Sequence, residues 1–137
     1  MPFGGNDWLA LTQETTLESD LPICDPHHHF YFRRLDRIPY HNYHIEDLYG
    51  DLNSGHNVVS TVFVEARAMY RPDGPEEMRP VGEVEFVQGM AAAGANGLYG
   101  TVRAAAAIVG HANLNLRERV EPVLQALQAA KIGRAHV

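Results

Sequence analysis

The sequence predicts an α/β fold in which parallel strands alternate with helices. Three short aliphatic segments, at residues 21–25, 58–66 and 101–109, are separated by two segments with helical periodicity. The ends of these segments lie 41 and 43 residues apart, a spacing typical of βαβ units with parallel strands. The length of 137 residues corresponds to a single domain with a substantial core.

The strands are predicted from apolar runs and from the residues that end them. Leu21 to Cys24 is short and apolar, and Pro26 ends the strand because proline cannot donate to a ladder. Residues 58–66 (VVSTVFVEA) are nearly all apolar or β-branched, which favours a strand buried on both faces. Residues 101–109 contain four alanines, so a helix is the alternative for this third segment.

Two central helices are predicted from apolar residues that recur every three or four positions. The first helix has an apolar stripe at i, i+3, i+4 and i+7, formed by Ile45, Leu48, Tyr49 and Leu52. Gly55 follows it and suits the left-handed conformation that ends many helices. The second helix opens near Pro80 and has one apolar face, formed by Val84, Val87 and Ala91. Glu83 and Glu85 lie in its first turns, where negative charge stabilises a helix.

Helices are also expected towards the two ends of the chain. Asn6 is a candidate N-cap for a short helix that ends before Leu21. Asn115 and Glu118 have the spacing of a capping box and open the last helix. Pro122 is expected near the start of that helix, after a short turn, because proline in a helix interior costs about 3 kcal/mol.

The composition indicates a globular protein of the reducing cytoplasm. Eleven Lys and Arg stand against seventeen Asp and Glu, which gives a net charge of −6 with neutral His. This balance argues against a broad nucleic-acid surface, which needs clustered positive charge. No apolar run approaches the roughly 20 residues of a membrane span, and the amino end does not resemble a signal peptide. Cys24 is the single cysteine, so no internal disulfide is expected.

Five of the eight histidines lie between His27 and His44, directly after the first predicted strand. Asp25, His27 and His29 are spaced by two, so in an extended segment they point to the same side, while His28 points away. Two imidazoles on one face can bind a divalent ion, and a nearby carboxylate can orient a ring. His27 and His29 are therefore predicted metal ligands, with Asp25 as a candidate substrate-binding group. The alternative is a polar loop with one packed ring.

Two further residues are candidate substrate-binding groups. Glu65 ends the second predicted strand and His111 follows the third, so both belong to the edge where the carboxyl ends of parallel strands meet. Each can equally be a hydrogen-bonded structural group. Arg33, Arg34 and Arg37, in the loop after the histidines, can bind a carboxylate, with a solvated basic surface as the alternative.

Four stretches of the sequence resemble a known family: LPICDPHHHF, GHNVVSTVFVEA, AMYRPDGPEEMRPVGEVEFV and GLYGTVRAAAAIVGHANL. They are similar to the N-terminal part of amidohydrolase-related proteins, hydrolases that include sugar lactonases and have aromatic-acid decarboxylases among their relatives. The resemblance covers roughly residues 7–130. It implies that residues 1–130 are the N-terminal portion, about three βα units, of a (β/α)8 TIM barrel with parallel strands.

The resemblance also implies a function. His27 and His29 would share a divalent metal ion, Zn²⁺ or Mn²⁺, with residues of later strands, and activated water would attack a lactone or a related C–O or C–N bond of a small organic acid. Some lactonases of the family use the same histidines without metal. The alternatives are a metal-dependent decarboxylase of the family, or a small non-catalytic metal-binding α/β domain. The expected partner is a small-molecule substrate, and no catalytic residue or oligomeric state is assigned.

The last seven residues, 131–137 (KIGRAHV), do not continue the apolar face of the helix before them. They correspond to the translation of a common sequencing adapter, so this tail is expected to be non-native. An ordinary helix end capped by Gly133 is the alternative. With about three of eight units present, the later metal ligands would be missing, and the chain as given is expected to be inactive.

Overall fold

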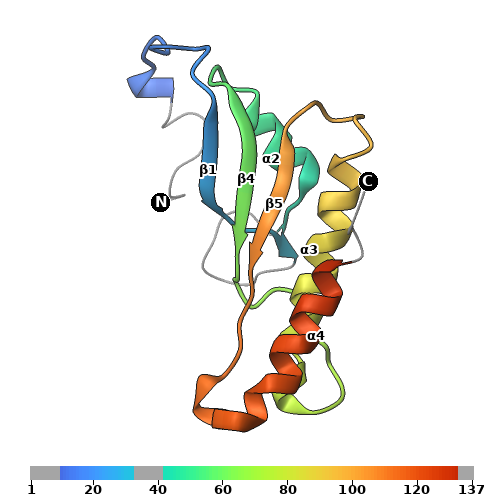
Figure 1. Cartoon of the computed structure of the whole chain (residues 1–137). Helices are drawn as coiled ribbons and strands as arrows, with labels where there is room; N and C mark the ends of the chain where they lie inside the picture. The colour runs from blue at the N-terminus through green and yellow to red at the C-terminus, as the bar shows by residue number, and fades with distance from the viewer. Residues whose placement is uncertain (1–9, 33–41, 133–137) are drawn as a thin grey trace.

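The computed structural model describes residues 10–32 and 42–132, and its centre is a three-stranded parallel sheet with helices on one face (Figure 1). The sheet contains β1 (Ile23–His28), β4 (Val58–Val64) and β5 (Arg103–Val109). The helices are α2 (Ile45–Leu52), α3 (Val81–Gly94) and α4 (Glu121–Ile132). Short elements complete the described part: the 3-10 turns η1 (Ala10–Thr12), η2 (Glu76–Met78) and η3 (Leu114–Val120), and the strands β2 (Tyr31–Phe32) and β3 (Asn42–Tyr43). The fold is therefore α/β, as predicted.

The strand order in the sheet is β1-β4-β5, and both neighbouring pairs are parallel. At the far end of the register, Val64 of β4 lies beside Val109 of β5. Because all three strands run the same way, their carboxyl ends meet at one edge, and we call this the carboxyl edge of the sheet. The prediction of parallel strands is confirmed, and residues 103–109 form a strand rather than the alternative helix.

The core lies between the sheet and the helices α2 and α3, which stand behind it in Figure 1. The apolar stripe predicted within residues 45–52 is buried on α2, and Val87 and Ala91 are the buried residues of α3 that join it. From the sheet, Phe63 is fully buried and stacks on Phe30 with ring centroids 5.8 Å apart. Burial of an aromatic ring removes roughly 150–250 Å² from water, so this pair contributes strongly to stability.

The side chain of Thr61, on the central strand, connects all three strands. Its hydroxyl oxygen accepts the N–H of Ala105 on β5 at 2.9 Å and lies 2.8 Å from Nε2 of His28 on β1. Ala105 has a φ of 48°, and the register between β4 and β5 shifts at this level. A threonine hydroxyl thus takes the place of a ladder carbonyl where the strand pairing is irregular.

The helices near the chain ends differ in detail from the predictions. Within the described residues, the helix expected before Leu21 is only the 3-10 turn η1. The turn η3 is capped by Asn113, whose side chain accepts the N–H of Asn115, so the proposed capping box of Asn115 and Glu118 is wrong. Pro122 lies near the start of α4, as predicted, where its missing N–H costs nothing. None of the helices in residues 10–32 and 42–132 has the length and apolarity to span a membrane.

The expectation that residues 58–66 are buried on both faces is wrong. Thr61 and Phe63 are buried, but the residues that alternate with them are only half-buried. In the described part of the chain, helices cover one face of the sheet, so the other face is open (Figure 1). The strand ends at Val64, which places Glu65 one residue beyond it.

The segment after β1 was expected to be a loop, and it contains a short antiparallel ladder. Tyr31 pairs with Tyr43, and Phe32 pairs with Asn42. Aromatic side chains favour extended pairing of this kind, which a search for longer apolar runs does not detect.

Replacing Phe63 by alanine should lower the free energy of unfolding by about 3–5 kcal/mol, because the change removes a fully buried ring and leaves a cavity beside Phe30. Urea-induced unfolding followed by circular dichroism measures the loss. Val59→Ala on the same strand is the matched control, since Val59 is 43% exposed and its truncation should cost about 1 kcal/mol at most. Equal losses in the two variants would contradict this assignment of the core.

Candidate functional site

His27 and His29 meet at the carboxyl end of β1. Their Nε2 atoms are 3.1 Å apart, and their rings are nearly perpendicular with centroids 4.8 Å apart. The prediction that alternation puts these two rings on one side of the chain is confirmed. His27 is exposed and His29 is half-buried, so a ligand can reach the pair from solvent. We call these two residues the histidine pair.

The ring of His29 is fixed by the neighbouring strand. Its Nδ1 lies 2.7 Å from the carbonyl oxygen of Val64, the last residue of β4. A carbonyl oxygen only accepts hydrogen bonds, so Nδ1 carries the proton and donates, which leaves a lone pair on Nε2. Histidines that bind metals are commonly oriented through their second ring nitrogen in this way. The end of β4 therefore sets both the tautomer and the direction of a side chain from β1.

The distance between the two Nε2 atoms suits a shared cation. Two nitrogens bound to a tetrahedral zinc ion at about 2.0–2.1 Å would be about 3.3 Å apart, close to the 3.1 Å found here. The same distance also suits a hydrogen bond donated by Nε2 of His27 to the lone pair of His29. Imidazole nitrogens fit Zn²⁺ better than Mn²⁺, which prefers oxygen ligands. The pair thus fits a zinc ion in donor type and spacing.

Further ligands are not gathered around the histidine pair in the described residues. Within residues 10–32 and 42–132, no group of three or more His, Cys, Asp or Glu side chains is arranged to hold a metal ion. Metal binding by His27 and His29 stays a prediction.

Asp25 does not orient either ring, so that part of the expectation is wrong. Its Oδ1 accepts the backbone N–H of His27 at 3.1 Å. The reason is local, since an aspartate readily bonds the N–H two residues on, and the intervening Pro26 has no N–H to compete. Asp25 shapes the path of the chain toward the pair, while the ring of His29 is oriented by Val64. A substrate-binding role for Asp25 stays a prediction.

His28 points away from the pair and into the core, as alternation predicts. It is 8% exposed, and its Nε2 lies 2.8 Å from the hydroxyl of Thr61. Burial lowers the pKa of His28 below the ordinary value of 6.5, so the ring is neutral at pH 7. Among the three adjacent histidines, His28 is the structural one.

Glu83 of α3 is a buried residue at this edge whose role the sequence analysis missed. It is 1% exposed, and its Oε1 accepts the N–H groups of Ala66 at 2.9 Å and Ala68 at 2.7 Å. Burial raises the pKa of its carboxyl group, and this effect outweighs the lowering by the two N–H groups. Smaller electrostatic effects come from Glu65, which raises the pKa, and from His29, which lowers it. Glu65 and His29 are therefore close enough for their charges to act on the carboxyl group of Glu83.

The other predicted residues lie at or beyond the ends of β4 and β5. Glu65 is half-buried, and its N–H donates to the carbonyl of Val109 at 2.9 Å, which extends the ladder by one residue. His111 lines a separate cavity of about 520 Å³ with residues of the loop after β4, among them Arg67 and Tyr70. Substrate binding by Glu65 and His111 stays a prediction. Three candidates fall outside the described residues: Arg33, Arg34 and Arg37.

The residues of this loop were not selected from the sequence. The signal that could have identified them is the long polar segment 67–79 directly after a strand, because loops at this edge often bind ligands. Which of its side chains face a cavity depends on the backbone path, and the sequence does not show that path.

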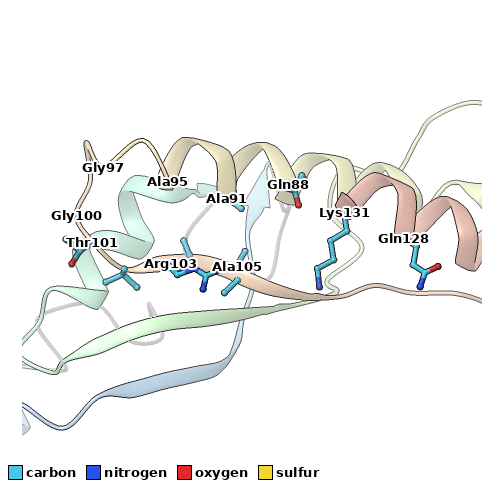
Figure 2. Close-up of a pocket in the computed structure, with 14 residues that line it drawn as sticks. Gln88, Ala91, Ala95, Gly97, Gly100, Thr101, Arg103, Ala105, Gln128 and Lys131 are labelled. Carbon is cyan, nitrogen blue, oxygen red and sulfur yellow. The ribbon is translucent and has the colours of Figure 1, made fainter. Parts of the chain in front are cut away.

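A larger cavity, of about 820 Å³, lies along the outer side of β5 (Figure 2). Residues of α3, of β5 and of the segment between them form most of its lining, and many of them are Ala or Gly. Gln128 and Lys131 reach toward it from α4. The cavity is lined by none of the predicted site residues. Volume alone therefore does not identify the chemical site in this chain.

Removing the charge of Glu83 should change how stability depends on pH. Because the pKa of Glu83 is raised in the folded state, the folded chain binds more protons than the unfolded chain between the two pKa values. The free energy of unfolding should therefore fall as pH rises from about 4.5 through the raised pKa. In Glu83→Gln the amide oxygen still accepts both N–H groups, and this part of the fall should vanish. Urea unfolding at a series of pH values measures the difference.

The carboxylate's structural role is tested by Glu83→Ala, which removes the partner of the half-buried N–H groups of Ala66 and Ala68. This variant should lose about 2–4 kcal/mol of unfolding free energy. Glu85→Gln is the matched control, because Glu85 lies two residues away on the same helix, is exposed and pairs only with exposed Arg71. It should change stability by less than about 1 kcal/mol. Equal effects in Glu83→Ala and Glu85→Gln would refute the role.

Comparison with known proteins gave no match: no protein-family model, no curated protein and no solved structure matches the chain. The geometry of the site therefore comes from this chain alone. The similarity of its motifs to amidohydrolase-related proteins supports a proposal of function, and the chain is not assigned to a family.

Proposed function

We propose that this chain contributes the first three βα units of an amidohydrolase-related (β/α)8 barrel that hydrolyses a lactone, or a related C–O or C–N bond, of a small organic acid. The observation that carries the proposal is the histidine pair at the carboxyl end of β1, with Nε2 atoms 3.1 Å apart and His29 fixed by Val64. Active sites of such barrels are built at this end of the strands.

The sheet topology supports the barrel part of the proposal. The order β1-β4-β5 follows the chain without reversal, and the helices of the described residues lie on one face of the sheet. A doubly wound fold reverses its strand order and covers both faces with helices. A barrel instead adds each strand beside the last and keeps the helices outside. In this proposal residues 1–130 belong to the barrel domain, and the catalytic chain extends beyond them.

The chemistry follows from the groups that this chain provides. His27 and His29 would hold a divalent ion through their Nε2 atoms, and the bond from Nδ1 of His29 to Val64 keeps the ring in the required tautomer. A bound ion of this kind acidifies water and polarises a carbonyl group. Glu65 lies one residue past β4, where its carboxylate can contact a substrate at the same edge. His111 follows β5, and its imidazole can contact a substrate at this edge as well.

Cobalt binding tests the histidine pair directly. Co²⁺, whose visible absorption reports tetrahedral imidazole ligation, should bind the chain, and His27→Ala and His29→Ala should each weaken binding by about tenfold or more. His56→Ala is the control, since His56 is exposed and distant in sequence from the pair. Unchanged affinity in all three variants would remove His27 and His29 as ligands.

Hydrolysis is tested with a chain expressed from a reading frame that continues beyond residue 130. This longer chain should hydrolyse sugar-derived or aromatic-derived lactones in a pH-indicator assay, and a chelator should slow the reaction until zinc is restored. His27→Ala and His29→Ala should remove at least about 99% of the rate. The 137-residue chain itself should be inactive.

Other outcomes would replace the proposal. Release of CO₂ from an aromatic acid without lactone hydrolysis would indicate the decarboxylase. Tight cobalt binding by the 137-residue chain, with no reaction of the longer chain, would indicate a non-catalytic metal-binding domain.

A further inference from the structure

The loop between β4 and α3 has a fixed path along the carboxyl edge. Glu83 holds its first residues through two backbone N–H groups. Gly82 allows the loop to approach α3 closely, since a Cβ there would lie only 2.6 Å from the carbonyl oxygen of Met69. Further on, the N–H of Arg71 donates to the carbonyl of Arg79 at 3.0 Å and closes the loop. The backbone is thus held at both ends and against the helix.

Two residues of this loop have left-handed backbone conformations. Arg67 has a φ of 59° and Met69 a φ of 57°, values that are uncommon for residues other than glycine. Such conformations persist only when the surroundings impose them, and they concentrate at ligand-binding sites. Here the contacts of Glu83 and Gly82 impose them, and the side chain of Arg67 lines the cavity of about 520 Å³. We call this space the Arg67 cavity.

The Arg67 cavity contains hydrogen-bond donors that lack partners. The hydroxyl of Tyr70 is buried and has no hydrogen-bond partner among the described residues. Arg67 and Arg79 also line the cavity, and both are exposed. Neither guanidinium is in an ion pair, because the one ion pair of residues 10–32 and 42–132 joins Arg71 to Glu85. A buried donor without a partner is costly unless a ligand satisfies it, and this applies to the hydroxyl of Tyr70. The two exposed guanidinium groups are hydrated, and an anion can replace that water.

The phenol of Tyr70 stays protonated and so has a hydrogen to donate. Burial, with smaller contributions from the nearby carboxylates of Glu83 and Glu65, raises the pKa of Tyr70 to about 12. A neutral O–H beside two guanidinium groups is suited to an anionic acceptor.

The remaining lining residues limit the kind of anion. Glu76 and Glu77, from the η2 turn, face the same cavity. Their charges offset those of the two arginines, so little net positive charge remains to compensate the desolvation of a group with two or more negative charges, which costs more than that of a carboxylate. A planar carboxylate also matches the fork of a guanidinium in two parallel hydrogen bonds.

We infer that the Arg67 cavity binds the carboxylate of a small organic acid, with Arg67 and Arg79 as charge partners and the Tyr70 hydroxyl as donor. This inference rests on the proposed function, whose substrate is such an acid, and it assigns the group that holds the substrate apart from the histidine pair. His111 supplies an imidazole from the segment after β5 to the same cavity.

The test uses the 137-residue chain, labelled with ¹⁵N, in an NMR titration with benzoate. Benzoate should bind with saturable shifts at Arg67, Tyr70, Arg79 and His111. Benzamide, which has the same shape and no charge, and inorganic phosphate should each bind at least about tenfold more weakly. Equal binding of benzamide would overturn the inference, and equal or tighter binding of phosphate would make the site a general anion site instead.

The decisive variant is Arg67→Gly. Glycine adopts a φ of 59° without strain, so the variant should unfold at the same or a higher temperature than the original chain. Benzoate affinity should nevertheless fall by about tenfold or more. Arg103→Ala is the matched control, because Arg103 is an exposed arginine that lies outside the Arg67 cavity, and it should bind benzoate normally. Undiminished benzoate binding by a folded Arg67→Gly variant would refute the inference.

The two proposals fail separately. His27→Ala should lose cobalt binding and keep benzoate binding, whereas Arg67→Gly should do the reverse. Loss of benzoate binding in both variants would place the anion at the histidine pair and overturn the assignment to the Arg67 cavity.

Discussion

The buried carboxylate of Glu83 is the contact on which the carboxyl edge of the sheet depends. One oxygen atom of α3 accepts two backbone N–H groups from the chain that has just left β4. This contact fixes where the following loop begins, and the close approach at Gly82 fixes how near it lies to the helix. Without such a partner the two half-buried N–H groups would lose their hydrogen bonds within the protein. The orientation of Arg67 and Tyr70 follows from this constraint.

The histidine pair has a similar dependence on a neighbouring strand. Its spacing comes from the alternation of side chains in β1, but the tautomer of His29 comes from the carbonyl of Val64 on β4. Parallel pairing of β1 with β4 brings these groups together. The Arg67 cavity in turn combines the loop after β4 with His111 after β5. Each part of the candidate site thus needs at least two strands in register.

The sequence predicted the features that depend on short-range periodicity. The strand positions follow from short apolar runs. The buried stripe of α2 and the common side of His27 and His29 follow from spacings of two to four residues. Glu83 was interpreted as a favourable charge at a helix start, because that local explanation is sufficient by itself. Its actual partners are backbone groups of Ala66 and Ala68, which no residue pattern reveals. The bond from the N–H of His27 to Asp25 was not foreseen for the same reason, since it too involves a backbone group.

If His29 binds a metal ion as proposed, its hydrogen bond to Val64 would couple the affinity for the ion to the pairing of β1 with β4. An ion that binds more tightly when β1 and β4 are paired must also stabilise this pairing by the same free energy, because the coupling between two equilibria is reciprocal. Conversely, a remote substitution that loosens this pairing would weaken coordination without touching a ligand. In that case the affinity for the ion would report how firmly β1 and β4 are joined at this edge.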